Sequence, residues 1–439
     1  MDKKIINKKN LIDIIFNTIG LILLIIFFYK LYFESFIAIS GDELNSILVY
    51  STNLKTILLK NFPGNVTFFH FFGYIKSLLI GYELNSYRII TFVFFLIHLL
   101  ISKKMKFGRN ETILFCIILI STNFSLYAGL YIGYIFSSCI FVLIAFLLNS
   151  ENRETYNKII LFFLFIQIYN HLVNLYLVMP IILGLFIFSK KKKFLKELLI
   201  YFILPTLLFY LLSIILTGIA INSINTSDIN YVFDYLSKNF FSIFYDGIIR
   251  IFFYEAYSNV KDFNLINFLN ELYNFDKWIL LFFILSIIIP ILKFNYVNSI
   301  FIIIQISHFI MLFLINKQPA PRIFTAFMAF YLVITFISFK NNRFVLNEPQ
   351  KNTILSILLI LFLSFKVYNF NYSEVVKKSI YAKDIRSKEN QISLKFLNKD
   401  CSLQNYDFNE LQKRNFYFNY LNKCKKKFKL NEFLSYYRS

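Results

Sequence analysis

The feature that most constrains this chain is the recurrence of apolar runs of about 20 residues, the length that an α-helix needs to cross a bilayer. The first run covers residues 11–33, and others follow along most of the sequence. Of the residues, 57% are hydrophobic and 16% are charged, whereas roughly 25% are charged in soluble domains. We therefore predict an all-α polytopic membrane protein.

About eleven transmembrane helices are predicted from these runs. Two of them, 111–124 and 157–169, are short enough to be tilted, broken or merged with a neighbour. The predicted spans cover residues 11–33, 86–102, 111–124, 132–149, 157–169, 172–189, 196–217, 276–294, 297–315, 322–339 and 352–370.

The basic residues predict how these spans are oriented. Lysine and arginine favour the cytoplasmic side of a membrane, and lysines precede the first span, so the N-terminus is predicted inside. If each span crosses once, the basic loops 103–109, 190–196 and 340–343 also fall inside. The net charge of +21 is then a signal of orientation. No recognised nucleic-acid-binding motif accompanies the charge, so nucleic acid is not expected as a partner.

This orientation places three long regions outside. They are the first outer loop, 34–85, the second outer loop, 218–275, and the tail from 371. The tail 371–439 is basic but keeps many apolar and aromatic residues, which predicts a small folded domain and not a disordered end. The chain is thus divided into a transmembrane domain, 1–370, and a small basic extracytoplasmic domain, 371–439.

Two stretches of the outer loops have the pattern of juxtamembrane helices. In the stretch 64–82, polar residues recur at helical spacing among aromatic ones: His70, Gly73, Lys76 and Ser77. A basic amphipathic helix of this kind fits the interface plane better than the hydrocarbon centre. Interpreting it as a span would instead move the basic loop 103–109 outside. The run 239–257 is interpreted as a second surface helix.

An acidic pair follows the first span on the outer side. Asp42 and Glu43 lie near the predicted membrane surface, where a carboxylate can take a proton from an incoming acceptor or hold a cation. The alternative is structural, because Asp42 precedes an apolar stretch and could cap the start of a helix. The residues themselves leave both interpretations open.

The motifs that follow this pair resemble those of the GT-C superfamily of integral-membrane glycosyltransferases. The pair Asp42-Glu43 precedes a basic, proline-containing segment at 60–64, then Gly81, and then Arg88 at the start of the next span. The later segment 316–324 is similar to a Pro/Arg segment of the superfamily. The resemblance covers most of residues 1–340. The chain departs from the pattern in having a single proline at 63 and no charge in 123–131.

The resemblance implies an enzyme that inverts the anomeric centre. Its donor would be a polyprenyl phosphate-linked sugar, and its acceptor an envelope glycolipid or glycan, as in transferases of lipopolysaccharide sugars. Asp42 would be the general base, and Glu43 would orient the acceptor or assist. Arg322, Arg88 and Lys60 would hold the donor phosphate. The site and the tail would lie outside the bacterial cytoplasmic (inner) membrane. No cofactor is expected, and no divalent metal, because a monophosphate donor carries less charge than a diphosphate.

Other residues have both a binding and a structural interpretation. His70, Tyr127 and Tyr131 are candidates for binding substrate, but an aromatic belt at the membrane interface would explain the tyrosines equally well. The basic candidates could instead be anchors whose charged ends reach the head groups. Cys401 and Cys424 both lie in the outer tail, where an oxidising environment permits a disulfide between them. The alternative is two free thiols.

Two rival functions remain compatible with a polytopic chain. A transporter or lipid flippase tends to place ionisable groups within its spans, and here these are chiefly His98 and His308. An O-antigen polymerase-like enzyme would depend on arginines of a large late outer loop, such as Arg250. The carboxylates of this chain gather in its outer loops, which favours chemistry at the membrane surface.

Overall fold

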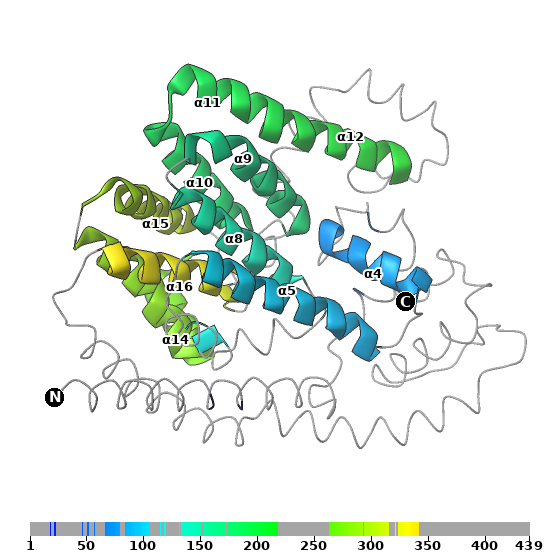
Figure 1. Cartoon of the computed structure of the whole chain (residues 1–439), viewed down its shortest axis with the longest axis horizontal. Coiled ribbons are helices and arrows are strands. Elements are labelled where there is room, and N and C mark those ends of the chain that lie inside the picture. Colours follow the sequence, from blue (N-terminus) through cyan, green and yellow to red (C-terminus); the bar gives the residue numbers. More distant parts are fainter. Residues whose placement is uncertain are drawn as a thin grey trace, which may run out of the picture.

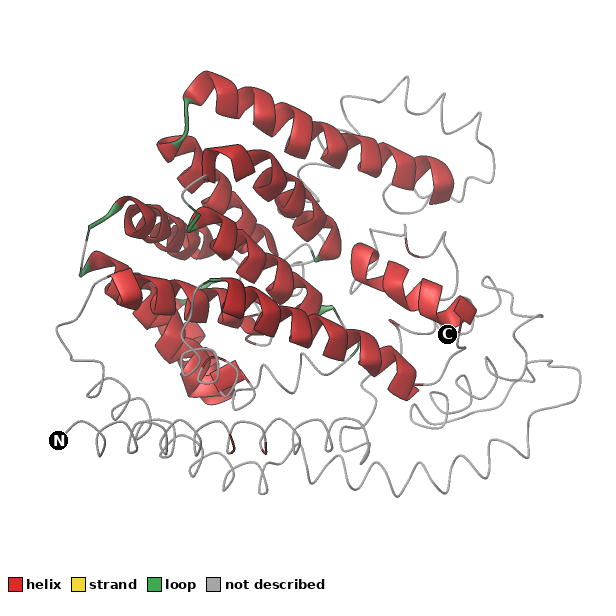
Figure 2. Cartoon of the chain, in the orientation of Figure 1, coloured by secondary structure: helices red, strands yellow, loops and turns green. Residues whose placement is uncertain are grey.

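Helices make up all the regular secondary structure that the computed structural model describes (Figure 1, Figure 2). The described residues are 66–79, 84–105, 131, 133–150, 153–171, 174–217, 263–292, 294–315, 321 and 324–341, with isolated residues at Thr18, Ile22, Ser46, Ser51, Ile57, Phe115, Ile118 and Leu119. The helices are α4 (Thr67–Leu79), α5 (Leu84–Lys104), α8 (Tyr134–Leu148), α9 (Arg153–Asn170), α10 (Leu175–Phe188), α11 (Lys191–Leu198), the π-helical turn η4 (Leu199–Ile203), α12 (Leu204–Thr217), α14 (Leu265–Ile291), α15 (Tyr296–Ile315) and α16 (Phe324–Asn341). The all-α prediction is confirmed for this part of the chain.

The helices coincide with most of the predicted spans. The matching elements are α5, α8, α9, α10, the continuous α11–η4–α12 helix, the later part of α14, α15 and α16. Two stretches, Leu265–Ile291 and Tyr296–Phe313, are long and apolar enough to cross a membrane. Shorter apolar helices occur at Tyr87–His98, Tyr134–Leu148, Leu175–Phe188 and Phe324–Lys340.

Other predicted elements fall outside the described residues. The spans 11–33 and 111–124 contain only isolated described residues. The span 352–370, the surface helix 239–257 and the tail 371–439 contain none. These elements therefore stay predictions.

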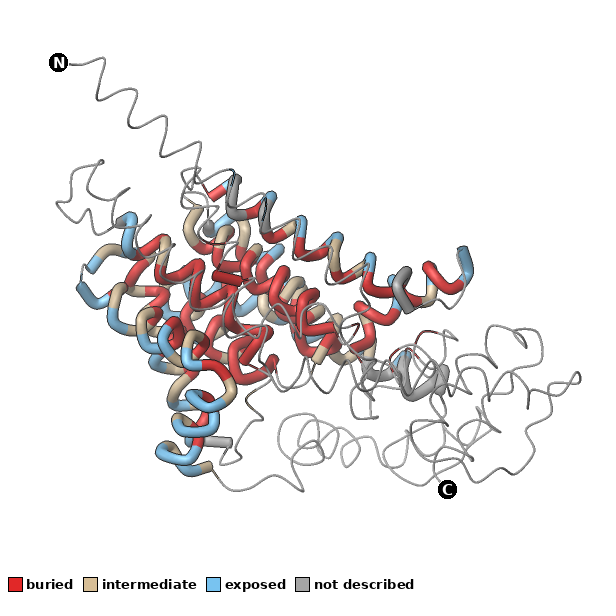
Figure 3. Tube along the Cα trace, turned by 90° about the horizontal axis from the view of Figure 1, so that it is seen from below, coloured by how far each residue is buried: buried red, intermediate tan, exposed pale blue. Residues whose placement is uncertain are grey.

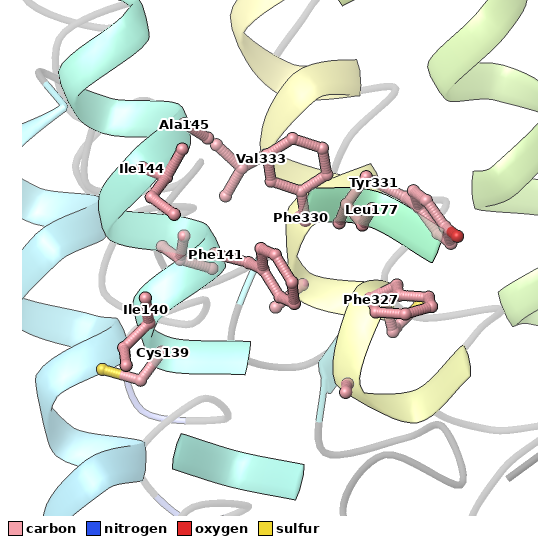
Figure 4. Packing of buried hydrophobic residues seen from close by; sticks show 14 of the residues in the cluster. Cys139, Ile140, Phe141, Ile144, Ala145, Leu177, Phe327, Phe330, Tyr331 and Val333 are labelled. Carbon is pink, nitrogen blue, oxygen red and sulfur yellow. The ribbon is translucent and has the colours of Figure 1, made fainter. Parts of the chain in front are cut away.

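The centre of the bundle is formed by α8 and α16, which are buried on almost every side. α8 packs against α5, α9 and α16, and α16 also packs on α14. The ring centre of Phe141 in α8 lies 5.6 Å from that of Phe327 and 6.0 Å from that of Phe330 in α16 (Figure 4). A helix that is apolar all round is typical of a protein core or a membrane span, and buried residues gather in the middle of the bundle (Figure 3).

The outer helices carry stripes of exposed apolar side chains. These lie at Ile89, Val93, Leu96 and Leu100 in α5 and at Leu281, Ile284, Ile288 and Ile291 in α14. Residues three or four positions apart share one face of a helix, so each set forms a continuous stripe. Soluble monomers rarely expose large contiguous apolar surface. Lipid tails are as apolar as leucine, so a bilayer is the solvent that suits this surface.

α14 contains a break at Asp276, where the backbone leaves helical geometry (φ −161°, ψ 105°). The carboxylate Oδ1 of Asp276 accepts a hydrogen bond from the backbone N–H of Trp278 at 2.9 Å, as an N-cap residue does at the start of a helix. The break coincides with the predicted start of the span 276–294. The helical stretch before it, 265–275, falls in the predicted second outer loop and was missed.

α10 contains a proline, and α15 supplies the hydrogen bond that the proline removes. Pro180 has no N–H, so the carbonyl of Tyr176, four residues earlier, lacks its helical donor. Nδ1 of His308 in α15 donates to this carbonyl. Nε2 of His308 therefore accepts, and the hydroxyl of Tyr331 in α16 donates to it at 2.8 Å. One imidazole thus joins three helices.

His98 joins α5 to α8 in the same way. Its Nδ1 donates to the carbonyl of Phe94 at 2.8 Å within α5. Its Nε2 then accepts from the hydroxyl of Ser138 in α8 at 3.0 Å. Hydrogen bonds between helices hold a bundle together in lipid, where hydrophobic burial alone does not distinguish protein from solvent.

Candidate functional site

The structure describes three of the predicted site residues, and all three are buried. His70 is in α4, Arg88 is near the start of α5, and Tyr131 lies just before α8. The ring centres of His70 and Tyr131 are 6.1 Å apart, so the structure brings these two residues together. The others lie outside the described residues: Asp42, Glu43, Lys60, Tyr127, Arg322, Cys401 and Cys424.

α4 turns its polar stripe, together with Phe69, toward the bundle and an apolar face outward. Its predicted polar stripe is buried, namely His70, Gly73, Lys76 and Ser77. The exposed residues are Phe71, Phe72, Ile75, Leu78 and Leu79. With 13 residues, α4 is about 20 Å long, shorter than a hydrocarbon core of about 30 Å. Its length fits the predicted surface helix, but its polar face meets protein instead of water.

Tyr131 is held at this face by hydrogen bonds from two directions. The Ser51 hydroxyl donates to the carbonyl of Ser46 at 2.7 Å, so the Tyr131 hydroxyl is the donor in its 3.2 Å contact with Ser51 Oγ. The Tyr131 hydroxyl also lies 3.5 Å from the carbonyl of Phe69 in α4. Burial raises the pKa of Tyr131, so the hydroxyl stays protonated and can donate.

Gly73 is the residue that lets Tyr131 come this close to α4. A Cβ at Gly73 would overlap the Tyr131 hydroxyl and would lie 2.6 Å from Ser51 Oγ. Any side chain there would therefore push Tyr131 and α4 apart. Gly73 thus fixes the distance between α4, the first outer loop at Ser51 and the segment before α8.

One cationic side chain is buried over the ring of Tyr87, which packs on Tyr131, and a second buried cation follows Tyr87 in the sequence. Nζ of Lys76 lies 3.7 Å from the ring centre of Tyr87, and the ring centre of Tyr87 lies 4.9 Å from that of Tyr131. Lys76 is 6% exposed, and Arg88, which follows Tyr87, is 1% exposed. A cation over an aromatic face is attracted to it, most strongly away from water. We call Lys76, Tyr87, Arg88 and Tyr131 the cation–tyrosine cluster.

His70 forms a hydrogen bond with the backbone at the start of its own helix, α4. The backbone N–H of Val66, just before the helix, donates to Nδ1 of His70 at 3.3 Å, so the ring proton is on Nε2. Burial lowers the pKa of His70 to about 3, and the imidazole is neutral at physiological pH. Because its Nδ1 lone pair is used by the backbone, His70 does not act as a general base through this atom.

A second buried polar group lies at the ends of α8, α9 and α10. Nδ2 of Asn174 donates to Ser137 Oγ at 3.0 Å and to Gln167 Oε1 at 2.9 Å. Nε2 of Gln167 donates to the Ser137 carbonyl at 2.6 Å, and Nδ2 of Asn170 donates to Ser137 Oγ. All four side chains are at most 1% exposed. We call them the amide cluster.

Gly133 links the two clusters. Its carbonyl lies 3.5 Å from Nδ2 of Asn170 in the amide cluster, and Tyr131 of the cation–tyrosine cluster is two residues away. Two residues span at most about 7 Å, so the clusters are neighbours at one end of the bundle. Gly133 has φ +84°, and a Cβ there would overlap Val66 at the start of α4. Glycine adopts this φ without strain.

Sequence reasoning found only part of this arrangement. Lys76 was recognised in the polar stripe of α4 but was not predicted to belong to the site, and the amide cluster was missed. Its signal was present, because Gln167, Asn170 and Asn174 are spaced as one face of a helix within apolar sequence. They were overlooked because they straddle the boundary between two predicted spans.

The cation–tyrosine cluster can hold an anion, since an arginine guanidinium binds phosphate through two hydrogen bonds. Within the described stretches, no group of three His, Cys, Asp or Glu side chains could hold a metal ion. Comparison with protein-family models, curated proteins and solved structures finds no match for this chain.

Proposed function

We propose that this chain is an inverting glycosyltransferase of the GT-C type. It moves a sugar from a polyprenyl phosphate-linked donor to an envelope glycolipid or glycan. The observation that carries the proposal is the burial of two cations: Lys76 lies over the ring of Tyr87, and Arg88 follows Tyr87 in α5. A polyprenyl phosphate leaving group needs cations or dipoles to stabilise its charge, and this cluster offers cations.

The first outer loop reaches the same place. Ser51 belongs to the loop that contains Asp42 and Glu43, and Ser51 contacts the cation–tyrosine cluster through the Tyr131 hydroxyl at 3.2 Å. A proton acceptor and a phosphate site must be neighbours for a sugar to be transferred between them. The contact of Ser51 supports an approach of this loop to the cluster.

The proposed membrane arrangement has about eleven spans, with the site and the tail on the outer face of a bacterial cytoplasmic membrane. α10 supports this orientation. It begins next to Asn174 of the amide cluster, and shortly after its other end come the exposed lysines Lys191, Lys192 and Lys193. Basic residues favour the cytoplasmic side, so the end of α10 that carries the two polar clusters is assigned to the outside.

The proposed reaction is a single displacement. The carboxylate of Asp42 takes the proton of an acceptor hydroxyl while the hydroxyl oxygen forms a bond to the anomeric carbon. The bond between that carbon and the donor phosphate oxygen breaks, and its electron pair leaves with the polyprenyl phosphate. Attack opposite the leaving group inverts the anomeric centre.

The other residues bind and orient the substrates. Glu43 orients the acceptor, and Arg322, Arg88, Lys60 and Lys76 hold the phosphate. Of this set the structure describes Arg88, which belongs to α5, and Lys76, which belongs to α4. A monophosphate leaving group needs less charge compensation than a diphosphate, so no divalent metal is assigned. Activity that is lost with a chelator and restored with Mg²⁺ or Mn²⁺ would contradict this assignment.

The transporter alternative gains no support from the buried histidines. His98 and His308 each use both ring nitrogens in hydrogen bonds that join helices. A histidine that carries protons or ions across a membrane needs to exchange its partners. Arg250, on which the polymerase alternative depends, lies outside the described residues.

Mass spectrometry of envelope glycolipids and polysaccharides would test the function. A strain lacking the gene is complemented with the intact protein, with Asp42→Asn, or with Glu154→Gln. Glu154 is an exposed carboxylate at the start of α9 and serves as the matched control. We expect a species that loses one sugar in the deletion strain. The intact protein and Glu154→Gln should restore the sugar, and expressed Asp42→Asn should not.

Two other outcomes would change the proposal. Restoration by Asp42→Asn would show that Asp42 is not the base and would favour its helix-capping role. An unchanged glycan profile in the deletion strain, with a lipid-linked intermediate retained on the inner face, would favour the transporter. The lost mass identifies the class of sugar transferred.

A further inference from the structure

The amide cluster contains one buried acceptor that the described residues do not satisfy. Asn170 Oδ1 has no hydrogen-bond partner, although the residue is fully buried. The side-chain atoms around it are engaged with one another, since Asn174 and Gln167 bond to each other and to Ser137. Buried polar atoms are usually paired, so an exception in a native structure calls for a ligand, a water or a function.

The orientation of the Asn170 amide is set by its surroundings. Its Nδ2 faces the carbonyl of Gly133 at 3.5 Å, and a carbonyl oxygen can only accept. Turning the amide over would bring Oδ1 against this carbonyl and would still leave one polar atom of Asn170 unmatched. In this orientation, in which Nδ2 also donates to Ser137 Oγ, the missing partner of Asn170 Oδ1 is a donor, such as a hydroxyl group.

Two aromatic rings are close to the amide cluster in the sequence. The ring centres of Tyr134, which follows Gly133, and of His171, which follows Asn170, lie 5.8 Å apart, and His171 is partly exposed. Small-molecule sites combine aromatic walls with a few convergent polar groups, among them Asn and Gln side chains. A site built to bond one hydroxyl rejects an analogue that lacks it, because its own polar atom is then left unpaired.

The position of the amide cluster relates it to the donor. Tyr131 of the cation–tyrosine cluster is two residues from Gly133, whose carbonyl faces Asn170, a separation of at most about 7 Å along the chain. A sugar is joined directly to its phosphate in a polyprenyl phosphate sugar. The sugar of a donor whose phosphate lies at the cation–tyrosine cluster is therefore expected at the end of the bundle that carries the amide cluster.

We propose that Asn170 Oδ1 accepts a hydrogen bond from a ring hydroxyl of the donor sugar, so that the amide cluster selects which sugar is transferred. This inference rests on the proposed glycosyltransferase function, and it divides the substrate between two groups of residues. The cation–tyrosine cluster binds the phosphate of any donor. The amide cluster distinguishes one sugar from another.

Thermal unfolding of the full-length protein in lipid nanodiscs tests this division. The probes are undecaprenyl phosphate alone and undecaprenyl phosphate carrying glucose, galactose, mannose or N-acetylglucosamine. The variants are Asn170→Leu and the matched control Asn157→Leu. Asn157 is a buried asparagine near the other end of α9, and its Nδ2 donates to Ser189 Oγ at 3.0 Å.

The expected result has two parts. Undecaprenyl phosphate should stabilise the wild type and both variants. At least one sugar-bearing lipid should add a further shift in the wild type and Asn157→Leu, and Asn170→Leu should bind that lipid at least about tenfold more weakly, equivalent to 1.4 kcal/mol. Monodeoxy versions of the selected sugar give a test on the wild type alone, because removal of one particular hydroxyl should abolish the sugar-dependent shift.

The outcomes separate this inference from the proposed function. If neither lipid stabilises the wild type, the proposed function fails and this inference fails with it. If the sugar-dependent shift survives in Asn170→Leu, or no single deoxy position matters, only this inference is overturned. A wild type that responds to the lipid phosphate but to no sugar would show that Asn170 Oδ1 meets only an internal water, which also overturns it.

Discussion

His308 in α15 donates a hydrogen bond to the backbone carbonyl of Tyr176 in α10, the carbonyl that Pro180 leaves without a helical donor. Buried polar atoms that lack a partner cost roughly 1–3 kcal/mol each, so a proline in a buried apolar helix needs such compensation. The proline of one helix and the histidine of another thus form one structural unit.

Replacement of His308 should therefore cost less when Pro180 is also replaced. His308→Leu alone should lower the free energy of unfolding by about 2 kcal/mol, because it leaves two polar groups without partners. In the Pro180→Ala background, the new N–H at position 180 can bond to Tyr176, and about 1 kcal/mol of that loss should disappear. Denaturant titration of the four proteins in detergent measures the difference. Equal losses in both backgrounds would show that the histidine and proline are independent.

Gly73→Ala should destabilise the protein even though alanine favours helices more than glycine by about 1 kcal/mol. The new methyl group would overlap the Tyr131 hydroxyl, at an expected net cost of about 2 kcal/mol. In Tyr131→Phe this oxygen is absent, so adding Gly73→Ala there should cost less. Thermal unfolding of the single and double variants measures this. A stabilising Gly73→Ala would contradict the close approach.

The stability of the protein should fall in mild acid because of His70. Its pKa is lowered from 6.5 to about 3 by burial, so between these values the unfolded chain binds a proton that the folded chain excludes. The stability linked to the neutral His70 is fully present above pH 6.5 and is lost as the pH falls toward 3. From pH 7.5 to 5.5, the wild type should lose about 1 kcal/mol more than His70→Gln. If the stabilities of the wild type and His70→Gln fell equally with pH, His70 would be exposed to solvent in the folded protein.

Binding of lipid phosphate should depend on the two buried cations. Arg88→Gln and Lys76→Gln should each weaken binding of undecaprenyl phosphate at least about tenfold, since charge-assisted hydrogen bonds contribute roughly 1.5–3 kcal/mol. Arg88→Lys should be intermediate, because lysine keeps the charge but not the two-pronged geometry. Lys104→Gln, at an exposed position at the other end of α5, is the control. Full binding by Arg88→Gln would exclude Arg88 from the phosphate site.

The predicted topology can be tested at two junctions that flank the span 352–370. Alkaline phosphatase, which is active only outside the cytoplasm, should be inactive when fused after Asn341, at the end of α16. It should be active when fused after Ser439. Green fluorescent protein should give the opposite pattern. The same result at both junctions would show that residues 352–370 do not cross the membrane.

The sequence predicted helix positions well because membrane spans depend on a local property. A run of apolar residues identifies a helix without knowledge of its neighbours, and α5, α8, α10 and α15 lie close to their predicted bounds. The predicted start of the span 276–294 coincides with the break in α14 at Asp276 for the same reason, because the apolar run begins there. The helix before it was missed because a half-polar stretch in a long loop has no such signal.

The candidate site was harder to predict because it depends on contacts between distant segments. Ser51 and Tyr131 are 80 positions apart in sequence, and neither sequence neighbourhood indicates the other. Arg88 and Tyr131 were identified through a family pattern, whereas Lys76 enters through its contact with Tyr87. Predicting the amide cluster would have required knowing that the ends of α8, α9 and α10 lie side by side.

α4 packs on this bundle in the opposite way to an amphipathic helix of a soluble protein, which buries its apolar face. Its outward face is apolar and its inward face combines polar side chains with the fully buried Phe69, so contact with lipid tails costs this helix nothing. Three specific contacts add to the ring packing of Phe69: the Ser77 hydroxyl, shared between the carbonyls of Ser51 and Tyr74, Lys76 over Tyr87, and the fit of Gly73 to Tyr131. Each of these three contacts depends on a particular partner. The contacts that hold α4 in place therefore also fix its position relative to Tyr87 and Tyr131.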